Sequence, residues 1–414
     1  MPLIHRRTSH DDADSIDETQ PQSADQKKPK SRRPPNTAFR QQRLKAWQPI
    51  LTPKTVLPLF FTIGIIFAPI GALLLYASFR VQELTIDYTH CATEASSTLS
   101  EIPTKYVQAH FKSVNLKSHP AQWLIYTNSS APDGQQDVCR LRFRIEHDMT
   151  PPILAYYKLT NFYQNHRRYV QSIDEDQING KAVPANKLRS DNLCKPLVLN
   201  PEGKPYYPCG LIANSYFNDT FASPVFKGDI EVHNADADNV PFNMTQTGIA
   251  WSNDKKRFQK TAYKASEVVP PPNWQASFPD GYTDDNLPDI SEWESLQNWM
   301  RTAGLPTFSK LVLRNDTQSL SKGVYEIDIG LHFPVTVYGG TKSLVISTRS
   351  VVGGRNNFLG IAYLVVGGLC IVLGLLFTVR HLIKPRKLGD HTYLSWNNEN
   401  SLSSSAPLAG TATR

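Results

Sequence analysis

Two long apolar segments, at residues 56–79 and 358–379, contain no Asp, Glu, Lys, Arg or His. A helix rises about 1.5 Å per residue, so each segment would be roughly 33–36 Å long and could cross a hydrocarbon core about 30 Å thick. The pattern predicts a protein that crosses a membrane twice. Its other parts would be an N-terminal tail at residues 1–55, a large domain at 80–357 and a C-terminal tail at 380–414.

The region between the two apolar segments alternates apolar and polar residues, which is typical of half-buried strands. The alternation is most regular at residues 139–145 and 325–333, and residues 122–127, 153–159 and 342–349 are further strand candidates. We therefore expect a large β-rich domain with an antiparallel, sandwich-like fold.

One helix is expected inside this domain. Ser291 followed by Glu294 has the spacing of a capping box at a helix N-terminus. Apolar side chains then recur on one helical face, and Gly304 with Pro306 would end the helix. That face consists of Trp293, Leu296, Trp299, Met300 and Ala303.

The positive charge of the chain lies in its tails. Residues 1–55 carry a balance of +5 and residues 380–414 a balance of +3, whereas residues 80–357 carry −1. Basic flanks stay on the cytosolic side of a membrane, so both termini are predicted to be cytosolic. The near-neutral central domain argues against nucleic-acid binding, which needs a basic face.

Four glycosylation sequons all fall between the apolar segments, at Asn128, Asn218, Asn243 and Asn315. Their position predicts an N-glycosylated, exoplasmic domain. No sequon lies in either tail.

Four of the five cysteines, namely Cys91, Cys139, Cys194 and Cys209, also lie in the central domain. An oxidising compartment favours two disulfides, for which three connectivities are possible and sequential pairing is the simplest. A zinc site is the rival interpretation, but no Cys-x-x-Cys pair supports it.

Small residues line one face of each apolar segment. In the first segment they are Gly64, Ala68, Gly71 and Ala72, and in the second they are Gly360, Gly367 and Gly374. Small residues allow membrane helices to approach closely. The two faces could pack on each other, on helices of a partner, or on both.

Two further segments are candidates for partner binding. Residues 36–53 combine aromatic and basic side chains, including Phe39, Arg40, Arg43 and Trp47, and could lie at the membrane surface or dock on a partner. His166, Arg167 and Arg168 form a basic run beside aromatic residues, and we expect a structural or interface role for them.

No catalytic motif is present. GxSxG, HExxH, GxxxxGK[ST], GxGxxG and the Asp-Lys-Thr-Gly motif of ion pumps are all missing. The apolar segments have no ionisable residue and so offer no proton relay or ion path. The residues alone predict a non-enzymatic membrane glycoprotein, either a subunit of a larger complex or a receptor or scaffold that binds a ligand through its exoplasmic domain.

The chain resembles the ligand-effect-modulator family, the accessory (β) subunits of the type-IV P-type ATPases that flip phospholipids. The resemblance covers roughly residues 35–387. It is carried by NTAFRQQRLKAWQPILTP (36–53), FTIGIIFAPIG (61–71), NFYQNHRRYV (161–170), PCGLIANSYFNDTF (208–221), GIAW (248–251), WMRTAGLPTFSKL (299–311) and GGTKSLVIST (339–348).

The resemblance implies a non-catalytic subunit that forms a heterodimer with the ATPase through both spans and the exoplasmic domain. Such a subunit supports folding of the ATPase, its exit from the endoplasmic reticulum and the movement of membrane phospholipid from the exoplasmic to the cytosolic leaflet. This chain would need no cofactor, because ATP and magnesium belong to the partner.

The resemblance also bears on individual residues. It implies the pairs Cys91–Cys139 and Cys194–Cys209, and it favours Asn218 among the sequons for an N-linked glycan. The expected location is a membrane of the secretory pathway: the endoplasmic reticulum, the Golgi or endosomes, or the plasma membrane. The four central cysteines and the long polar N-terminal tail resemble the fungal members.

Overall fold

A computed structural model of the chain describes residues 36–44, 51–111, 119–131, 135–228, 239–350 and 353–385. The chain divides into two units, Met1–Val56 and Leu57–Arg414. In the first unit, residues 36–44 form a turn in which the Arg43 amide donates to the Ala38 carbonyl (2.7 Å). The second unit contains both sheets and the helices described below.

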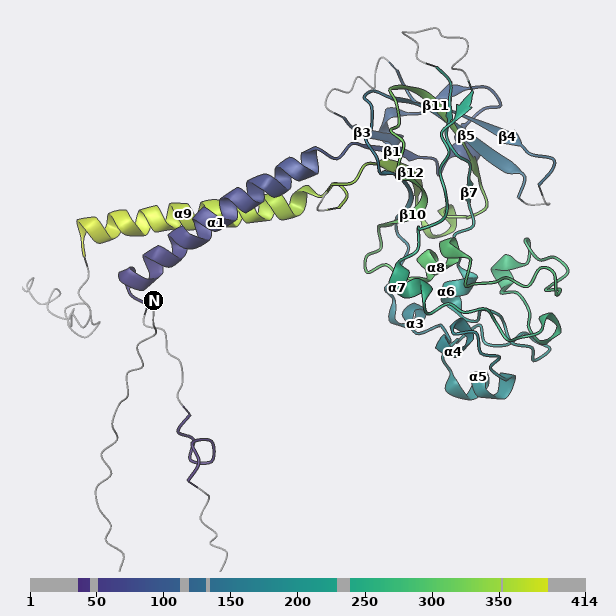
Figure 1. The fold of residues 1–414 in the computed structure, drawn as a ribbon, viewed down its shortest axis with the longest axis horizontal. Helices are drawn as coiled ribbons and strands as arrows, with labels where there is room; N and C mark the ends of the chain where they lie inside the picture. The colour runs from purple at the N-terminus through teal and green to yellow at the C-terminus, as the bar shows by residue number, and fades with distance from the viewer. Residues whose placement is uncertain are drawn as a thin grey trace, which may run out of the picture. The chain divides into compact units, whose positions relative to one another are not determined.

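The domain between the apolar segments contains two antiparallel sheets (Figure 1). The first sheet has the strand order β10-β6-β12-β1-β3. Its strands are β1 Glu83–Asp87, β3 Val107–His110, β6 Ile153–Leu159, β10 Phe308–Asn315 and β12 Lys342–Ser347. Strand β1 leads out of the first apolar helix and β12 leads towards the second, and they pair directly, with Glu83 opposite Ser347.

The second sheet has the order β2-β4-β5-β11-β8-β9, and β7 pairs with β11 beside this path. Its strands are β2 Ser100–Glu101, β4 Gln122–Thr127, β5 Asp137–Ile145, β7 Thr220–Phe221, β8 Val225–Phe226, β9 Val240–Pro241 and β11 Gly323–Gly330. The five segments with alternating residues are all strands, as predicted. Two of them end earlier than expected, β11 at Gly330 and β12 at Ser347.

Alternation along β5 and β11 separates a core face from a solvent face. Leu141 pairs with Ile327 and both are buried, whereas the neighbouring Arg140 pairs with Asp328. The Arg140 guanidinium Nε lies 2.7 Å from the Asp328 carboxylate, so the outer face is held by a cross-strand ion pair. Apolar residues from both sheets belong to one core, which confirms the β-rich fold.

Short helices connect the strands, and all but the first of them lie between β6 and β10 in the chain and gather together beside the sheets (Figure 1). They are α2 Cys91–Glu94, α3 Arg167–Val170, α4 Glu175–Ile178, α5 Ala185–Asp191, α6 Leu211–Asn214, α7 Ser252–Lys255 and α8 Glu294–Met300. Short 3-10 turns at Thr104–Tyr106, Ala265–Glu267, Pro272–Trp274 and Thr336–Tyr338 complete the connections.

The helix expected around Trp299 exists, but its predicted capping box is wrong. Helix α8 begins only at Glu294, and its N-cap position, Trp293, provides no side-chain bond. The Ser291 hydroxyl instead donates to Asp289 (2.6 Å), and the Glu294 carboxylate accepts from the Ala250 amide (3.1 Å). Glu294 therefore serves a tertiary contact, which sequence spacing alone could not reveal.

Two disulfides fasten the domain, and their pairing is the sequential one. Cys91–Cys139 joins α2 to β5 across 48 residues, and Cys194–Cys209 closes a loop across 15 residues. On the chain-entropy model these loops correspond to about 4 and about 3 kcal/mol of stabilisation. No zinc site is formed by these four cysteines, because all of them are oxidised.

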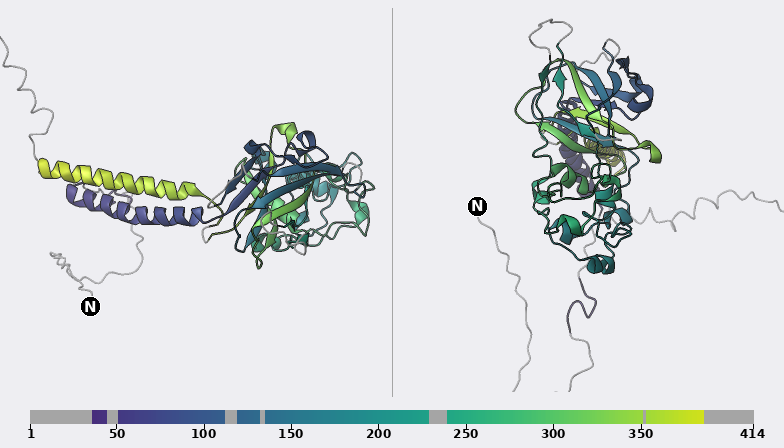
Figure 2. Two further views of the ribbon diagram at one scale, coloured as in Figure 1. Left: turned by 90° about the horizontal axis from the view of Figure 1, so that it is seen from above. Right: turned by 90° about the vertical axis from the view of Figure 1, so that its right-hand side faces the viewer.

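The apolar segments form two helices, α1 Pro53–Phe79 and α9 Asn357–Ile383. Each is long and apolar enough to cross a membrane. Residues 57–79 of α1 run beside α9, as Figures 1 and 2 both show.

Candidate functional site

The small-residue faces of the two apolar helices pack on each other. A Cβ atom added at Gly71 would lie 2.8 Å from the Leu364 backbone nitrogen and 2.9 Å from the Gly360 carbonyl oxygen. One added at Gly367 would lie 3.0 Å from the backbone nitrogen of Ala68. These contacts leave no room for a larger side chain, so the glycines set the separation of the helices.

The same arrangement extends along the rest of the pair. A Cβ atom at Gly64 would meet the Ile371 side chain at 2.5 Å, and one at Gly374 would meet the Phe61 ring at 3.2 Å. Ala72 differs, because its side chain is exposed. It lies one turn after Ala68, which is why the spacing alone includes it in this face.

The outer face of each helix is left uncovered within this chain. Its large apolar side chains, which include Leu73, Val365, Leu369 and Val372, are 55–68% exposed. Exposing these apolar side chains to water would cost free energy, whereas lipid or a membrane-embedded partner can cover them without that cost.

A polar contact fastens the pair where it meets the β-rich domain. The Ser78 hydroxyl donates to the Asn357 side-chain oxygen (2.6 Å) and accepts from the Asn356 amide (3.0 Å). The Asn356 side chain in turn caps α9 by accepting from the Phe358 amide (3.0 Å). This contact fixes the end of α1 against the start of α9.

The candidate partner-binding residues of the N-terminal tail belong to the first unit. Phe39, Arg40 and Arg43 are exposed, and the Arg43 guanidinium donates to the side chain of Asn36. Trp47 lies outside the described residues. An aromatic ring that is 75% exposed, as Phe39 is, remains available for a lipid surface or a partner.

The basic run His166-Arg167-Arg168 lies on the surface at the start of α3. All three side chains are exposed, and no hydrogen bond or ion pair joins them to another described side chain. Tyr163 is also exposed, at 56%. The run is therefore a solvent-exposed basic patch of the described surface, and its role at an interface stays a prediction.

Sequence runs that carry the family resemblance meet around Trp299. Its indole nitrogen donates to the Ile212 carbonyl (2.8 Å), and its ring lies 5.5 Å from that of Phe162 and 6.1 Å from that of Phe333. The Gln164 side chain accepts from the Ala303 amide (2.8 Å). These runs thus build one aromatic cluster, and their shared role is to hold the domain together.

A buried lysine completes α8. Lys310 donates through Nζ to the carbonyls of Asn298 (2.6 Å), Trp299 (3.0 Å) and Arg301. Burial lowers the pKa of Lys310 to about 7. An ammonium that donates to carbonyls left free at a helix C-terminus satisfies them and complements the helix dipole.

A second buried lysine forms an ion pair with Asp219, the middle residue of the Asn218 sequon. Lys342 Nζ lies 2.8 Å from Asp219 Oδ2, and the side chains are 6% and 0% exposed. The Tyr88 hydroxyl donates to the same oxygen (3.0 Å), while the amides of His332 and Phe333 donate to Oδ1 (2.7 Å each). One carboxylate therefore joins four separate segments of the chain.

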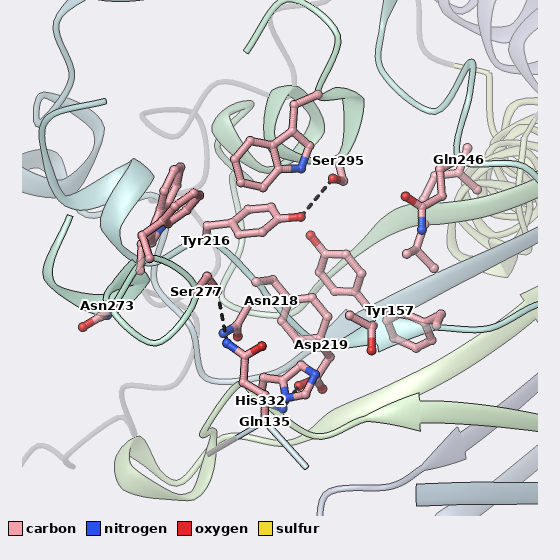
Figure 3. Close-up of a pocket in the computed structure, with 18 residues that line it drawn as sticks. Gln135, Tyr157, Tyr216, Asn218, Asp219, Gln246, Asn273, Ser277, Ser295 and His332 are labelled. Atoms are coloured by element: carbon pink, nitrogen blue, oxygen red, sulfur yellow. Dashed lines mark hydrogen bonds between the residues drawn. The ribbon is translucent and has the colours of Figure 1, made fainter. Parts of the chain in front are cut away.

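A hollow of about 360 Å³ lies directly beside this ion pair. Figure 3 shows Asn218, Asp219 and His332 at one side of it. At the other side, the hydroxyls of Tyr216 and Ser295 form a hydrogen bond with each other (2.9 Å). Its wall mixes polar side chains with seven aromatic ones, namely Tyr157, Tyr216, Phe217, Phe221, Trp274, Phe278 and Trp293.

The four sequon asparagines differ in accessibility. Asn128 and Asn243 are exposed and Asn218 is half-buried, but Asn315 is only 8% exposed. The Asn315 amide nitrogen donates to the Asn243 carbonyl (2.7 Å), and its oxygen accepts from the Thr317 amide (3.0 Å). A glycan on Asn315 would require these bonds to break.

We therefore expect Asn315→Gln to leave the number of glycans unchanged and to lower the free energy of unfolding by about 1–3 kcal/mol, because buried partners lose their hydrogen bonds. The measurement is electrophoretic mobility before and after deglycosylation, together with thermal unfolding. Asn243→Gln, at an exposed sequon, is the control and should remove one glycan with little effect on stability. Loss of a glycan from the Asn315 variant would contradict this assignment.

No group of three or more His, Cys, Asp or Glu side chains that could hold a metal occurs within the described residues. The buried charged groups Asp219 and Lys310 are both satisfied by internal partners.

Sequence reasoning missed the Asp219–Lys342 pair. The two residues are far apart in the chain. Lys342 begins a predicted strand, and Asp219 is the middle residue of a sequon, where any residue but proline is allowed.

Comparison with known proteins gives a consistent result. The family model described as CDC50: LEM3 (ligand-effect modulator 3) family / CDC50 family matches residues 74–387. A Saccharomyces cerevisiae protein named phospholipid-transporting ATPase accessory subunit CRF1 is 46% identical over 377 residues, 91% of this chain and 92% of that protein.

Two further relatives carry the same kind of name. The phospholipid-transporting ATPase accessory subunit CDC50 of Chaetomium thermophilum is 44% identical and covers 90% of this chain and 93% of its own length. The accessory subunit LEM3 of Saccharomyces cerevisiae is 41% identical, with 89% and 88% covered.

Proposed function

The chain belongs to the LEM3/CDC50 family, and on that premise we propose that it is the non-catalytic accessory subunit of a phospholipid-transporting P-type ATPase. The observation that carries this proposal is the similarity over nine-tenths of the chain to proteins with that name. ATP hydrolysis resides in the partner, and this chain is a two-span membrane protein with a β-rich domain.

The described structure fits such a role. The two spans use their glycines to pack on each other, so they form one two-helix unit with an apolar outer face. Neither span carries an ionisable residue within residues 56–79 or 358–379, and a pair of helices packed glycine to backbone encloses no polar route. The chain therefore anchors and supports a transporter instead of transporting lipid itself.

The orientation is part of the proposal. Both basic tails would be cytosolic, and the β-rich domain would face the lumen of the secretory pathway or the cell exterior. The two disulfides support this orientation, since disulfides persist in oxidising compartments. N-linked glycans on the exposed or half-buried sequons would follow from it.

The detailed work of the subunit is also proposed. It would assist folding of the ATPase and its exit from the endoplasmic reticulum, and it would support phospholipid movement from the exoplasmic to the cytosolic leaflet. The contact surfaces we propose are the outer face of the helix pair, the tail residues Phe39, Arg40, Arg43 and Trp47, and the basic run from His166 to Arg168.

The proposal is tested by purifying the tagged full-length chain from its native membrane in mild detergent. We expect a P-type ATPase to co-purify in a one-to-one ratio, identified by mass spectrometry, and phospholipid-stimulated ATP hydrolysis to follow that partner. The chain separated from it should show no hydrolysis.

A two-span receptor or scaffold is the alternative function. It would be supported if the intact chain were recovered without any ATPase while retaining a different bound protein or ligand. That result, obtained with a chain whose thermal unfolding is normal, would exclude the accessory-subunit proposal.

A further inference from the structure

Three arginines gather where the apolar helices meet the β-rich domain. Arg80 directly follows α1, Arg355 lies two residues before α9, and Arg349 lies two residues after β12. Within residues 76–83 and 347–358 these three cations face one acidic residue, Glu83, which gives this junction a net charge of +2. Residues beside a span lie at the depth of the lipid headgroups, so the charge would face the exoplasmic leaflet.

Hydrogen bonds beyond the end of the first sheet hold two of the arginines at the same place. The Gln82 amide donates to Thr348 Oγ1, and the Thr348 amide donates to the Gln82 carbonyl (3.0 Å each). These bonds continue the pairing of β1 with β12. Arg349 directly follows Thr348, and Arg80 precedes Gln82 by two residues, so both arginines lie at the membrane end of this strand pair.

Arg355 reaches the same junction from the start of α9. The adjacent Asn356 donates its amide to the Ser78 hydroxyl (3.0 Å), which fastens this part of the chain to the end of α1. Burial raises the pKa of the Glu83 carboxyl, whereas Arg355 and then Lys158 act to lower it. Arg355 and Lys158 therefore lie near that carboxyl and add positive charge around it.

The charge of the three arginines is not neutralised within the described residues. No ion pair to an Asp or Glu side chain is found for any of them there. Arg80 and Arg349 are exposed and Arg355 is half-buried. The Arg80 Nε donates to the Tyr76 hydroxyl (3.2 Å), and its guanidinium lies 5.0 Å from the centre of the Tyr76 ring. This contact orients Arg80 and leaves its charge free to meet an anion.

The helix dipoles and the usual charge bias of membrane proteins do not account for these cations. A cation is stabilised at a helix C-terminus, as Arg80 is, but destabilised at an N-terminus, where Arg355 lies. Lys and Arg beside a span are also favoured on the cytosolic side, opposite to the side proposed for this junction. A bound anion would offset both costs. There is room for one, because a Cβ atom added at Gly354 would meet nothing within 4 Å.

We propose that Arg80, Arg349 and Arg355 bind the phosphate of a phospholipid in the exoplasmic leaflet and favour headgroups with a net negative charge. Every phospholipid headgroup has a phosphate, and the planar guanidinium of Arg matches its geometry. A zwitterionic headgroup brings its own cation to the site, whereas an anionic headgroup neutralises the junction. The inference rests on the proposed exoplasmic orientation, and it gives this chain a lipid contact of its own.

The test uses the complex of the full-length chain with its ATPase in phosphatidylcholine nanodiscs. The nanodiscs contain a small amount of either photoactivatable phosphatidylserine or photoactivatable phosphatidylcholine. After illumination, mass spectrometry of peptides cut by a protease that does not cleave at arginine measures the lipid bound to residues 76–83 and 347–358, per recovered complex. We expect capture of the serine lipid to exceed that of the choline lipid about fivefold or more.

A matched set of variants locates the contact. Arg349→Gln and Arg355→Gln should each lower capture of the serine lipid about fivefold, because each removes one cation at the membrane surface. Arg355→Lys keeps the charge and should keep most of the capture. Arg380→Gln removes a cation at the opposite end of α9 and should leave capture at the junction unchanged. All four variants should melt at the temperature of the unchanged chain, because none of them breaks a described ion pair.

Several outcomes would overturn the inference. Equal capture of the two lipids at the junction, or capture that both glutamine variants leave unchanged, would show that the arginines bind no anionic headgroup. Loss of capture in the presence of inorganic phosphate would identify a site for free anions, and capture confined to ATPase peptides would show that the partner covers the arginines. Labelling of the junction by a membrane-impermeant reagent from the cytosolic side would refute the orientation, whereas recovery of the ATPase tests the proposed function separately.

Discussion

Lys342→Met is expected to lower the free energy of unfolding of the β-rich domain by about 3–5 kcal/mol, because it leaves the Asp219 carboxylate buried without its cation. That carboxylate is 0% exposed on its side chain, so water cannot replace the lost partner. For a domain of this size the melting temperature should fall on the order of 10 °C. Thermal unfolding of the purified protein measures the effect.

The remaining partners of Asp219 cannot compensate. Burial and the adjacent Asp219 carboxylate raise the pKa of Tyr88, so its hydroxyl stays protonated and continues to donate. The amides of His332 and Phe333 also remain. These neutral donors stabilise the carboxylate only in part, since a hydrogen bond from a neutral group is weaker than a charged contact.

An exposed ion pair with the same chemistry provides the control. Lys181 Nζ lies 2.8 Å from Asp176, the same separation as in the buried pair, but its side chain is 66% exposed. Lys181→Met should therefore leave the free energy of unfolding almost unchanged, especially as Lys187 also lies 2.8 Å from Asp176.

A double-mutant cycle separates the pair from its surroundings. Asp219→Asn keeps the sequon intact and leaves Lys342 buried with an unpaired charge. Asp219→Asn combined with Lys342→Met removes both charges and should cost clearly less than the sum of the single changes. Additive costs would mean that the two side chains do not interact and that the buried pair is not a unit.

The strands of this domain were predictable because each has one face in the core. Residues 139–145 and 325–333 show the two-residue period that such burial requires, and they pair as β5 and β11. Strand β10, Phe308–Asn315, was not predicted, because Ser309, Lys310 and Arg314 interrupt its apolar pattern. Lys310 is in fact buried, where it satisfies the end of α8, so a tertiary contact hid the local signal.

The helix faces show where sequence reasoning about the candidate site succeeded and where it stopped. The spacing of small residues predicted Gly64, Gly71 and Gly367 as packing positions, and in the structure a Cβ atom at each would lie within 3.0 Å of the other helix. The spacing could not say what they pack against, since a partner helix in the same chain and one in another chain require the same small face. The spacing also included Ala72, which is exposed although the preceding residue, Gly71, is buried.

Gly71 packs against the backbone of α9, so a larger side chain at this position should disturb the complex with the ATPase. Gly71→Leu is expected to reduce recovery of the co-purifying ATPase by about tenfold or more, because overpacking of this kind costs about 1–3 kcal/mol. The added side chain meets backbone atoms of α9, at 2.8 Å from the Leu364 nitrogen, and backbone cannot rotate away as a side chain can. The two helices must then separate or shift, which alters the outer face that a partner would bind.

The adjacent residue is the matched control. Ala72→Leu adds a similar volume at the same depth on the exposed side of α1, so it should leave the melting temperature of the chain unchanged. Gly367→Leu against Gly368→Leu repeats the comparison on α9, because Gly368 has nothing within 4 Å of an added Cβ whereas Gly367 meets Ala68 at 3.0 Å. Gly71→Leu should lower the melting temperature of the chain as well as the ATPase recovery, and a Gly71→Leu chain that kept both would show that the internal helix pair does not control assembly.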